Sequence, residues 1–296
     1  MDVELKAFLR RAEDLLARIE PLLPSQPPSI DWEHTLAARW QRDARSGHLA
    51  PLQVSLDMQL GDLIGIDRQR DLLAANTRQF VDGLPANHVL LWGARGTGKS
   101  SLIRALLAGY AESGLRLIEI ERDHLADLPR VVEQLAGLQQ AFVLFCDDLS
   151  FEAGEGDYRV LKSVLDGSLE RAPENVLLYA TSNRRHLVPE RQSDNENWQM
   201  VDGELHPNEA VEDKIALSDR FGLWLSFYPF TQQHYLSVVR HWIDSLARKA
   251  QLQWSWDEAL EKDAICWASG RGNRNGRCAY QYARQWVGKR LLQGQG

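Results

Sequence analysis

The chain has 296 residues, of which 44% are hydrophobic and 25% are charged, and its 34 lysines and arginines oppose 41 aspartates and glutamates. This length and apolar fraction are enough for one large domain or two modest ones, and they exclude a disordered chain and a small disulfide-stabilised protein. The net charge of −7 gives no overall positive field for nucleic acid or an anionic membrane, so such a partner would need a local basic patch.

The cysteines and the N-terminal residues indicate a soluble, cytoplasmic protein. Cys146, Cys266 and Cys278 lie far apart and form no CxxC pair, so we expect neither a structural zinc site nor a disulfide framework. The N-terminal segment carries charges throughout, unlike the apolar stretch of a signal peptide. No later run approaches the roughly 20 apolar residues of a membrane span, and we expect no membrane partner.

Residues 1–59 have helical patterns and no catalytic motif. Apolar residues recur at helical spacing up to Ile19, the proline-rich segment Pro21–Ser29 breaks this pattern, and Ile30–Gln41 carry a second short helical pattern. The sequence therefore predicts an N-terminal helical extension over residues 1–59.

Residues 60–229 alternate between helical stretches and apolar runs that are typical of buried strands. This alternation predicts an α/β fold in which helices cover both faces of a parallel sheet. Four runs have clear strand character and a fifth is shorter, so we expect a five-stranded parallel core. The expected strands are His88–Trp92, Leu115–Ile120, Ala141–Cys146, Asn175–Ala180 and Leu223–Phe227.

Residues 230–296 have a helical pattern and no convincing strand. Three helices are expected, over Thr231–Gln251, Trp256–Ser269 and Gly276–Gln293. They form either an additional helical layer on the core or a separate lid domain.

A glycine-rich segment after the first expected strand matches the phosphate-binding pattern GxxxxGK[ST] in its strand, loop and helix context. Glycines allow successive backbone N–H groups to turn toward a phosphate, and the helix N-terminus adds its positive dipole end. We expect Lys99 to reach the β- and γ-phosphates and Ser100 to bind Mg²⁺. The candidate nucleotide-binding residues are Gly93, Ala94, Arg95, Gly96, Thr97, Gly98, Lys99, Ser100 and Ser101.

Acidic and amide side chains follow two later strands. Asp147 and Asp148 end the strand Ala141–Cys146, and adjacent buried carboxylates are costly without a cation. We expect Asp147 to hold Mg²⁺ through water and Asp148 to orient or deprotonate the attacking water. Asn183 ends the next strand, where its amide can hold that water or the γ-phosphate.

The order of these motifs resembles that of the AAA+ ATPases. Gly93–Ser100 match Walker A, Asp147 and Asp148 match Walker B, and Asn183 matches sensor 1. The resemblance covers roughly residues 60–296, and it implies ATP and Mg²⁺ as cofactors and a lid over residues 230–296. The sequences FCDDLSFE, TSNRRHL and SDRFGL look like a bacterial AAA+ family of unknown function.

Three further segments are similar to AAA+ motifs. LSDRFG looks like the arginine-finger box, which implies that Arg220 reaches the γ-phosphate of a neighbouring subunit. GNRNGRCAYQYARQW looks like sensor 2, with Arg277 as the better match and Arg274 as the reserve. GDLIGIDRQRDLL resembles the segment that lies against the adenine. The residues implied there are Leu63, Ile64 and Gly65.

Some residues depart from the family pattern. The second Walker B carboxylate is usually glutamate, and the shorter Asp148 predicts slow hydrolysis or a switch that is read through its nucleotide state; Glu152 is a distant candidate for a substitute base. Glu121–Leu125 lack the aromatic and glycine of a pore loop, which argues against an unfoldase. The long segment Val188–Lys214 is strongly acidic, and its role stays open.

The leading hypothesis is an Mg²⁺-dependent ATPase that self-associates and remodels or switches an unidentified protein partner. One alternative is a nucleotide-gated binding module with little catalysis. Another is a nucleic-acid loader of the helicase-loader type, which the acidic balance and the absence of a basic motif disfavour.

Overall fold

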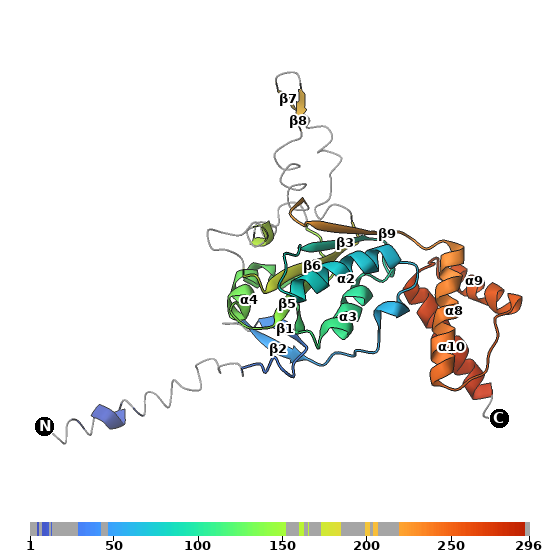
Figure 1. Cartoon of the computed structure of the whole chain (residues 1–296), viewed down its shortest axis with the longest axis horizontal. Coiled ribbons are helices and arrows are strands. Elements are labelled where there is room, and N and C mark those ends of the chain that lie inside the picture. Colours follow the sequence, from blue (N-terminus) through green and yellow to red (C-terminus); the bar gives the residue numbers. More distant parts are fainter. Residues whose placement is uncertain are drawn as a thin grey trace.

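A computed structural model describes residues 5, 8–11, 13, 29–42, 47–151, 160–162, 165, 173–184, 199–201, 204–206 and 219–293. An α/β unit with a central sheet contains most of them, and three helices at the C-terminal end lie to one side of it (Figure 1). Of the predicted N-terminal helix, residues 5, 8–11 and 13 are described and are helical. Among the described residues, no helix is both long enough and apolar enough to cross a membrane.

The central sheet has seven strands in the order β2-β1-β4-β5-β6-β3-β9. Neighbouring strands run parallel except for β1 and β2, which pair antiparallel at one edge. All five predicted strand segments are strands in the structure. The sheet strands are β1 (Ala37–Arg42), β2 (Gly47–Leu52), β3 (Val89–Gly93), β4 (Leu115–Glu119), β5 (Ala141–Cys146), β6 (Val176–Ser182) and β9 (Leu223–Phe227). Two short strands, β7 (Gln199–Val201) and β8 (Glu204–His206), form a separate antiparallel pair.

The predictions of five strands and of a helix over Ile30–Gln41 are wrong, because Ala37–Arg42 form strand β1 beside β4. The predicted helical extension over residues 1–59 is likewise wrong for residues 37–42 and 47–52, which form β1 and β2 of the central sheet. A short apolar run fits the helical and the strand period equally well, so long-range partners decide its structure. Here Arg39 forms an ion pair with Glu119 of β4, with Nη2 at 2.8 Å from Oε2. The indole N–H of the buried Trp40 donates to Asp127 at 3.0 Å.

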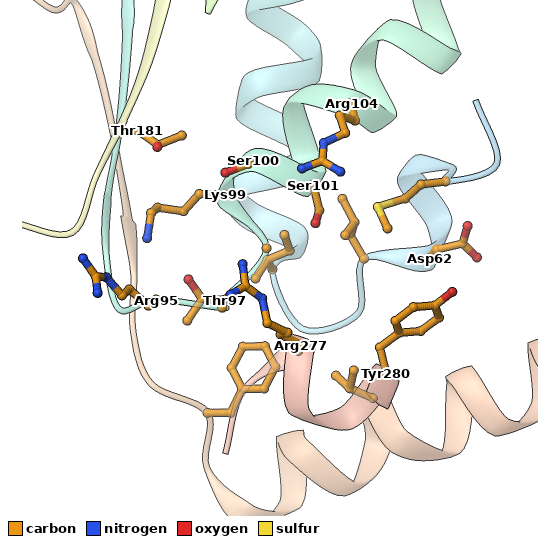
Figure 2. A pocket seen from close by; sticks show the side chains of 18 of the residues that line it. Asp62, Arg95, Thr97, Lys99, Ser100, Ser101, Arg104, Thr181, Arg277 and Tyr280 are labelled. Carbon is orange, nitrogen blue, oxygen red and sulfur yellow. The ribbon is translucent and has the colours of Figure 1, made fainter. Parts of the chain in front are cut away.

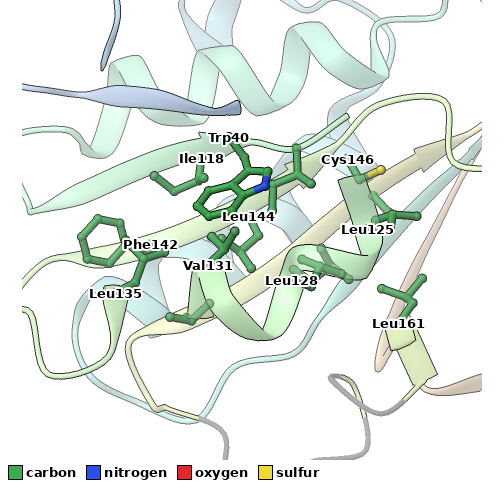
Figure 3. Close-up of a cluster of buried hydrophobic side chains, with 14 of the residues drawn as sticks. Trp40, Ile118, Leu125, Leu128, Val131, Leu135, Phe142, Leu144, Cys146 and Leu161 are labelled. Atoms are coloured by element: carbon green, nitrogen blue, oxygen red, sulfur yellow. The ribbon is translucent and has the colours of Figure 1, made fainter. Parts of the chain in front are cut away.

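Helices cover both faces of the sheet because successive residues of its buried strands point to opposite sides. Helices α2 (Asp67–Val81) and α3 (Lys99–Tyr110) share one apolar cluster with Val89 and Leu91 of β3. The intervening Leu90 belongs to the cluster on the other face, which contains residues of η3 (Arg122–Asp127) and α4 (Leu128–Leu135). Figure 3 shows this second cluster between α4 and the strands.

The three C-terminal helices have their own apolar cluster, which includes Tyr235, Ile243 and Tyr282. They are α8 (Gln232–Lys249), α9 (Glu258–Gly270) and α10 (Gly276–Gln293). The side chain of Thr231 caps α8, and that of Asp257 caps α9, each by accepting a backbone N–H of the first turn. A core of its own makes this helical group a distinct packing unit beside the sheet.

Candidate functional site

A glycine loop, residues 93–101, leaves the end of β3 and enters α3. Gly93, Gly96 and Gly98 have φ angles of 130°, 76° and 103°, which L side chains rarely adopt. A Cβ atom on Gly93 would lie 2.0 Å from the carbonyl oxygen of Phe227 in β9, so the loop also needs glycine there for space. The loop backbone and the N-terminus of α3 together form the type of concave surface that binds phosphate.

The ammonium group of Lys99 packs against the backbone of this loop, and the residue is only 7% exposed. It donates hydrogen bonds to the carbonyl oxygens of Gly93 (2.8 Å) and Ala94 (2.9 Å) and to Oδ1 of Asn183 (3.3 Å). Burial lowers the pKa of Lys99, and the nearby charges of Asp147 and Asp148 oppose this shift. Because the three bonded oxygens are neutral, the buried cation still lacks a directly bonded anion, which a phosphate would supply.

Two hydroxyl groups bond the carboxylate of Asp147, which follows β5. The Ser100 hydroxyl donates to its Oδ1 at 2.7 Å, and the Thr181 hydroxyl donates to the same oxygen at 2.5 Å. Carboxylate and hydroxyl oxygens are the hard ligands that Mg²⁺ prefers, so Ser100 and Asp147 fit a magnesium site next to the glycine loop.

Asp148 has an unusual backbone conformation and two side-chain partners. Its φ angle of 55° is in the left-handed region, which is uncommon for a residue other than glycine. Its carboxylate accepts a short hydrogen bond from the Asn183 amide and lies 3.5 Å from Nη2 of Arg95, in an exposed ion pair. The acidic strand end and the amide that ends the next strand thus lie together in space.

The opposite wall comes from residues before α2 and from α8. Leu63 and Ile64 line the cavity, whereas Gly65 lies next to them against His234 of α8. Gly65 has a φ angle of 78°, and a Cβ atom there would lie 1.8 Å from His234 Nε2. That nitrogen lies 2.9 Å from the carbonyl oxygen of Ile64, so α8 is attached directly to this segment.

The N-terminus of α10 rests on the glycine loop. The backbone N–H of Gly276 donates to the carbonyl oxygen of Gly96 at 2.9 Å, and the Asn275 amide donates to that of Arg95 at 3.3 Å. Arg277 therefore lines the cavity. Arg274, the other candidate, lies in the exposed turn before α10 and does not line it.

These groups surround one cavity of about 610 Å³, a size typical of small-molecule sites. Figure 2 shows Lys99, Ser100 and Thr181 at one end, Asp62 and Tyr280 at the other, and Arg277 between them. We call the part lined by residues 95–101 of the glycine loop and by Asp147, Asp148, Thr181 and Asn183 the loop end, and Gly93 and Ala94 of the same loop do not line the cavity. The helical end is lined by Met58, Asp62, Leu63, Ile64, Ile66, Phe230, Val238, Trp242, Gly276, Arg277 and Tyr280.

Sequence reasoning missed Thr181 and several residues of the helical end. Thr181 is an ordinary residue type for a buried strand, and nothing in its local sequence marks its two partners. Trp242 and Tyr280 belong to two stretches in which apolar residues recur at i, i+3 and i+4, a spacing that indicates ordinary packing between helices. They meet only in the fold, where their rings form an edge-to-face pair with centroids 4.8 Å apart.

Arg220 lies away from the cavity of its own chain. It precedes β9, whose Leu223 is paired with Val89 and whose Phe227 is paired with Gly93 at the start of the glycine loop. Arg220 and the glycine loop are therefore near opposite ends of β9, and the strand itself separates them by more than about 13 Å along its axis. Glu152 and most of Val188–Lys214 lie outside the described residues.

Comparison with known proteins gives one family and a common fold. The model of a family described as "Protein of unknown function (DUF815)" matches residues 33–290. A search of the curated proteins finds no match.

Solved structures with similar folds include a point mutant of the Thermotoga maritima RuvB protein, with a TM-score of 0.51 and 16% identity over 77% of this chain and 64% of that one. The Orc1 protein of Aeropyrum pernix, solved in complex with DNA, has a TM-score of 0.51 and 16% identity over 79% of this chain and 65% of that one. This chain thus spans less than two thirds of either protein. The chain belongs to the DUF815 family, and its fold is that of the AAA+ P-loop ATPases.

Proposed function

We propose that this protein is an Mg²⁺-dependent ATPase that binds ATP in the cavity and hydrolyses it slowly. It uses this hydrolysis to remodel or switch a partner macromolecule. The observation that carries the proposal is the meeting of four groups at the loop end: the Lys99 ammonium, the Ser100 and Asp147 oxygens, and the Asp148–Asn183 pair. Phosphate binding, metal binding and water activation each have a residue suited to them within one cavity.

The residues of the loop end bind the triphosphate in this proposal. Backbone N–H groups of Gly93–Ser101 and the N-terminus of α3 surround the phosphates, and Lys99 contacts their outer oxygens. Leu63 and Ile64 pack on the base, with Gly65 beside them. The choice of adenine follows from the resemblance of this segment to the AAA+ pattern.

Ser100 and Asp147 hold Mg²⁺. When bound between these side chains, Mg²⁺ would supply positive charge that screens the phosphates and makes the terminal one easier to attack. The chain's own contribution is to keep the two ligand side chains bonded to each other at 2.7 Å, so that the site is formed before the ion arrives.

Asp148 takes a proton from the attacking water, and Asn183 orients that water. In the structure the Asp148 carboxylate accepts the Asn183 amide and forms an ion pair with Arg95, so the attacking water must displace Arg95 before Asp148 can act on it. This requirement, with the short aspartate side chain, supports slow turnover. It also favours the second candidate, a nucleotide-gated binding module in which ATP persists.

Arg220 completes the site of a neighbouring subunit. The position of Arg220 before β9, at the end of that strand opposite to the glycine loop, supports action in trans, because it cannot reach the cavity of its own chain without unfolding β9. Self-association is therefore part of the proposal. Residues 230–296 act as the lid of the core 60–229, with Arg277 as sensor 2, and β1 and β2 add two edge strands to that core.

Single-turnover hydrolysis separates the ATPase from the binding module. With enzyme in excess over radiolabelled ATP and with Mg²⁺ present, we expect the wild type to release phosphate within minutes, and Asp148→Asn to be slower by about 100-fold or more. Asp123→Asn changes an exposed aspartate away from the cavity and serves as the control. Intact ATP in a stable wild-type complex after hours would contradict hydrolysis and support the module.

A further inference from the structure

Thr181 is a buried polar residue that no motif of the sequence assigns. It lies on β6 directly after Ala180, which is paired with Cys146 of β5, so it stands beside the residues that follow Cys146. Its side chain lines the cavity although the residue is only 1% exposed. A buried hydroxyl next to two carboxylates is costly unless it is fully bonded, which makes its partners informative.

The hydroxyl of Thr181 bonds both aspartates. It donates to Oδ1 of Asp147 at 2.5 Å and accepts the backbone N–H of Asp148 at 2.9 Å. A threonine hydroxyl has one proton to donate, so this donor is committed to Asp147. The carbonyl oxygen of Thr181 accepts the N–H of Leu149 at 2.7 Å, which holds the whole turn against β6.

These bonds have a consequence for each carboxylate. Oδ1 of Asp147 receives both the Thr181 and the Ser100 hydroxyls, whereas Oδ2 takes no hydrogen bond from any residue that the structure describes. The carboxylate is thus fixed in rotation, with one oxygen saturated and the other available to a cation. At Asp148 the bond to the N–H supports the left-handed backbone conformation, which directs the side chain toward Asn183.

A packing role alone would not need the hydroxyl. Valine has nearly the same shape as threonine and is at least as favourable in a buried strand. A buried threonine hydroxyl can be satisfied without acidic partners, as Thr77 of α2 is by the carbonyl oxygen of Leu73 at 2.8 Å and the hydroxyl of Tyr179 at 3.0 Å. Thr181 instead uses its donor and an acceptor on the two acidic residues of the site.

We propose that Thr181 is a positioning residue that orients Asp147 toward the metal and holds Asp148 in its working conformation. The inference rests on the proposed function, because it gives Thr181 a role in the site that is proposed to bind Mg²⁺ and to activate the attacking water. It predicts that loss of the hydroxyl weakens the metal dependence of nucleotide binding and the rate of hydrolysis, while nucleotide binding without metal is preserved.

The test compares Thr181→Val with Thr181→Ser and uses Thr77→Val as a matched control. Thr77 is as buried as Thr181 and its hydroxyl bonds Leu73 and Tyr179, outside the cavity. Each variant is titrated with ADP in a calorimeter, once in the presence of Mg²⁺ and once in EDTA. The ratio of the two affinities gives the enhancement of ADP binding by the metal. Single-turnover hydrolysis and thermal unfolding are measured on the same variants.

For Thr181→Val we expect the enhancement of ADP affinity by Mg²⁺ to fall by about tenfold, as for lost outer-shell partners of metal ligands, with unchanged affinity in EDTA. Hydrolysis should fall by about 100-fold, since small displacements of reacting groups have effects of that size. Thr181→Ser and Thr77→Val should match the wild type in both.

The proposal would be overturned if Thr181→Val had the same metal dependence of ADP binding and the same hydrolysis rate as the wild type. It would also be overturned if Thr181→Val and Thr77→Val lost both quantities equally, since that result points to general destabilisation. Wild-type protein that binds Mg²⁺·ADP without hydrolysing ATP would contradict the proposed function. In that case the metal dependence of ADP binding alone decides the role of Thr181.

Discussion

At the loop end of the cavity, backbone groups of one continuous segment form much of the wall, whereas at the helical end side chains from several distant segments do. The loop end depends on Gly93, Gly96 and Gly98, whose positive φ angles are set within a few residues of each other. The helical end depends on contacts such as that between Ile64 and His234, which are far apart in the sequence. The first end is therefore specified locally and the second only by the complete fold.

This difference predicts where the cavity tolerates change. A backbone wall cannot move aside when an atom is added, because its hydrogen bonds fix it in β3, β9 and α3. A side-chain wall can rearrange, and each residue contributes a small share of the contact area. Substitutions at the loop end should thus have much larger effects on nucleotide binding than those at the helical end.

The largest effect is expected for Gly93→Ala. The new methyl group would overlap the carbonyl oxygen of Phe227, and the residue would keep an unfavourable φ angle of 130°. The loop is expected to shift to relieve strain and overlap of about 3 kcal/mol, and phosphate binding would have to restore its conformation, so nucleotide affinity measured by titration with ADP should fall by about 100-fold or more. The outcome also tests whether the loop conformation itself forms the site.

Gly137→Ala is the control for this substitution. Gly137 also has a positive φ angle, of 78°, but no atom lies within 4 Å of an added Cβ. We expect a loss of stability of about 1 kcal/mol and unchanged ADP affinity. If both variants bound ADP like the wild type, the backbone wall would not be the phosphate site.

A much smaller effect is expected for Tyr280→Ala at the helical end. Its ring packs against Trp242 and lines the cavity, but 38% of the residue is exposed, so only part of its surface is available to a ligand. Loss of this area should lower ADP affinity by about threefold to tenfold in the same titration. Tyr228→Ala, which removes a 67% exposed tyrosine outside the cavity, should have no effect. A loss as large as that of Gly93→Ala would refute the contrast between the two ends.

The same contrast explains what could be predicted from the sequence. The glycine loop, Lys99, the acidic strand end and Asn183 were predictable because each signal is local and the carboxyl ends of parallel strands meet at one edge of the sheet. Strand β1 was not, because its structure depends on Glu119 and Asp127, partners that local periodicity does not reveal. Thr181 was missed for a similar reason, since its role lies in two bonds to a neighbouring strand.

The most direct test of the central claim is a complementation experiment on the site shared between subunits. Lys99→Ala removes the buried ammonium from the loop end, and Arg220→Ala removes the proposed finger, so each variant alone should hydrolyse ATP at least ~100-fold more slowly than the wild type. In assemblies formed from a 1:1 mixture, intact cavities of the Arg220→Ala subunit meet intact fingers of the Lys99→Ala subunit. Random assembly should then restore about a quarter of the wild-type rate in steady-state phosphate release. Full activity of Arg220→Ala alone, or no recovery in a verified mixed assembly, would contradict the account.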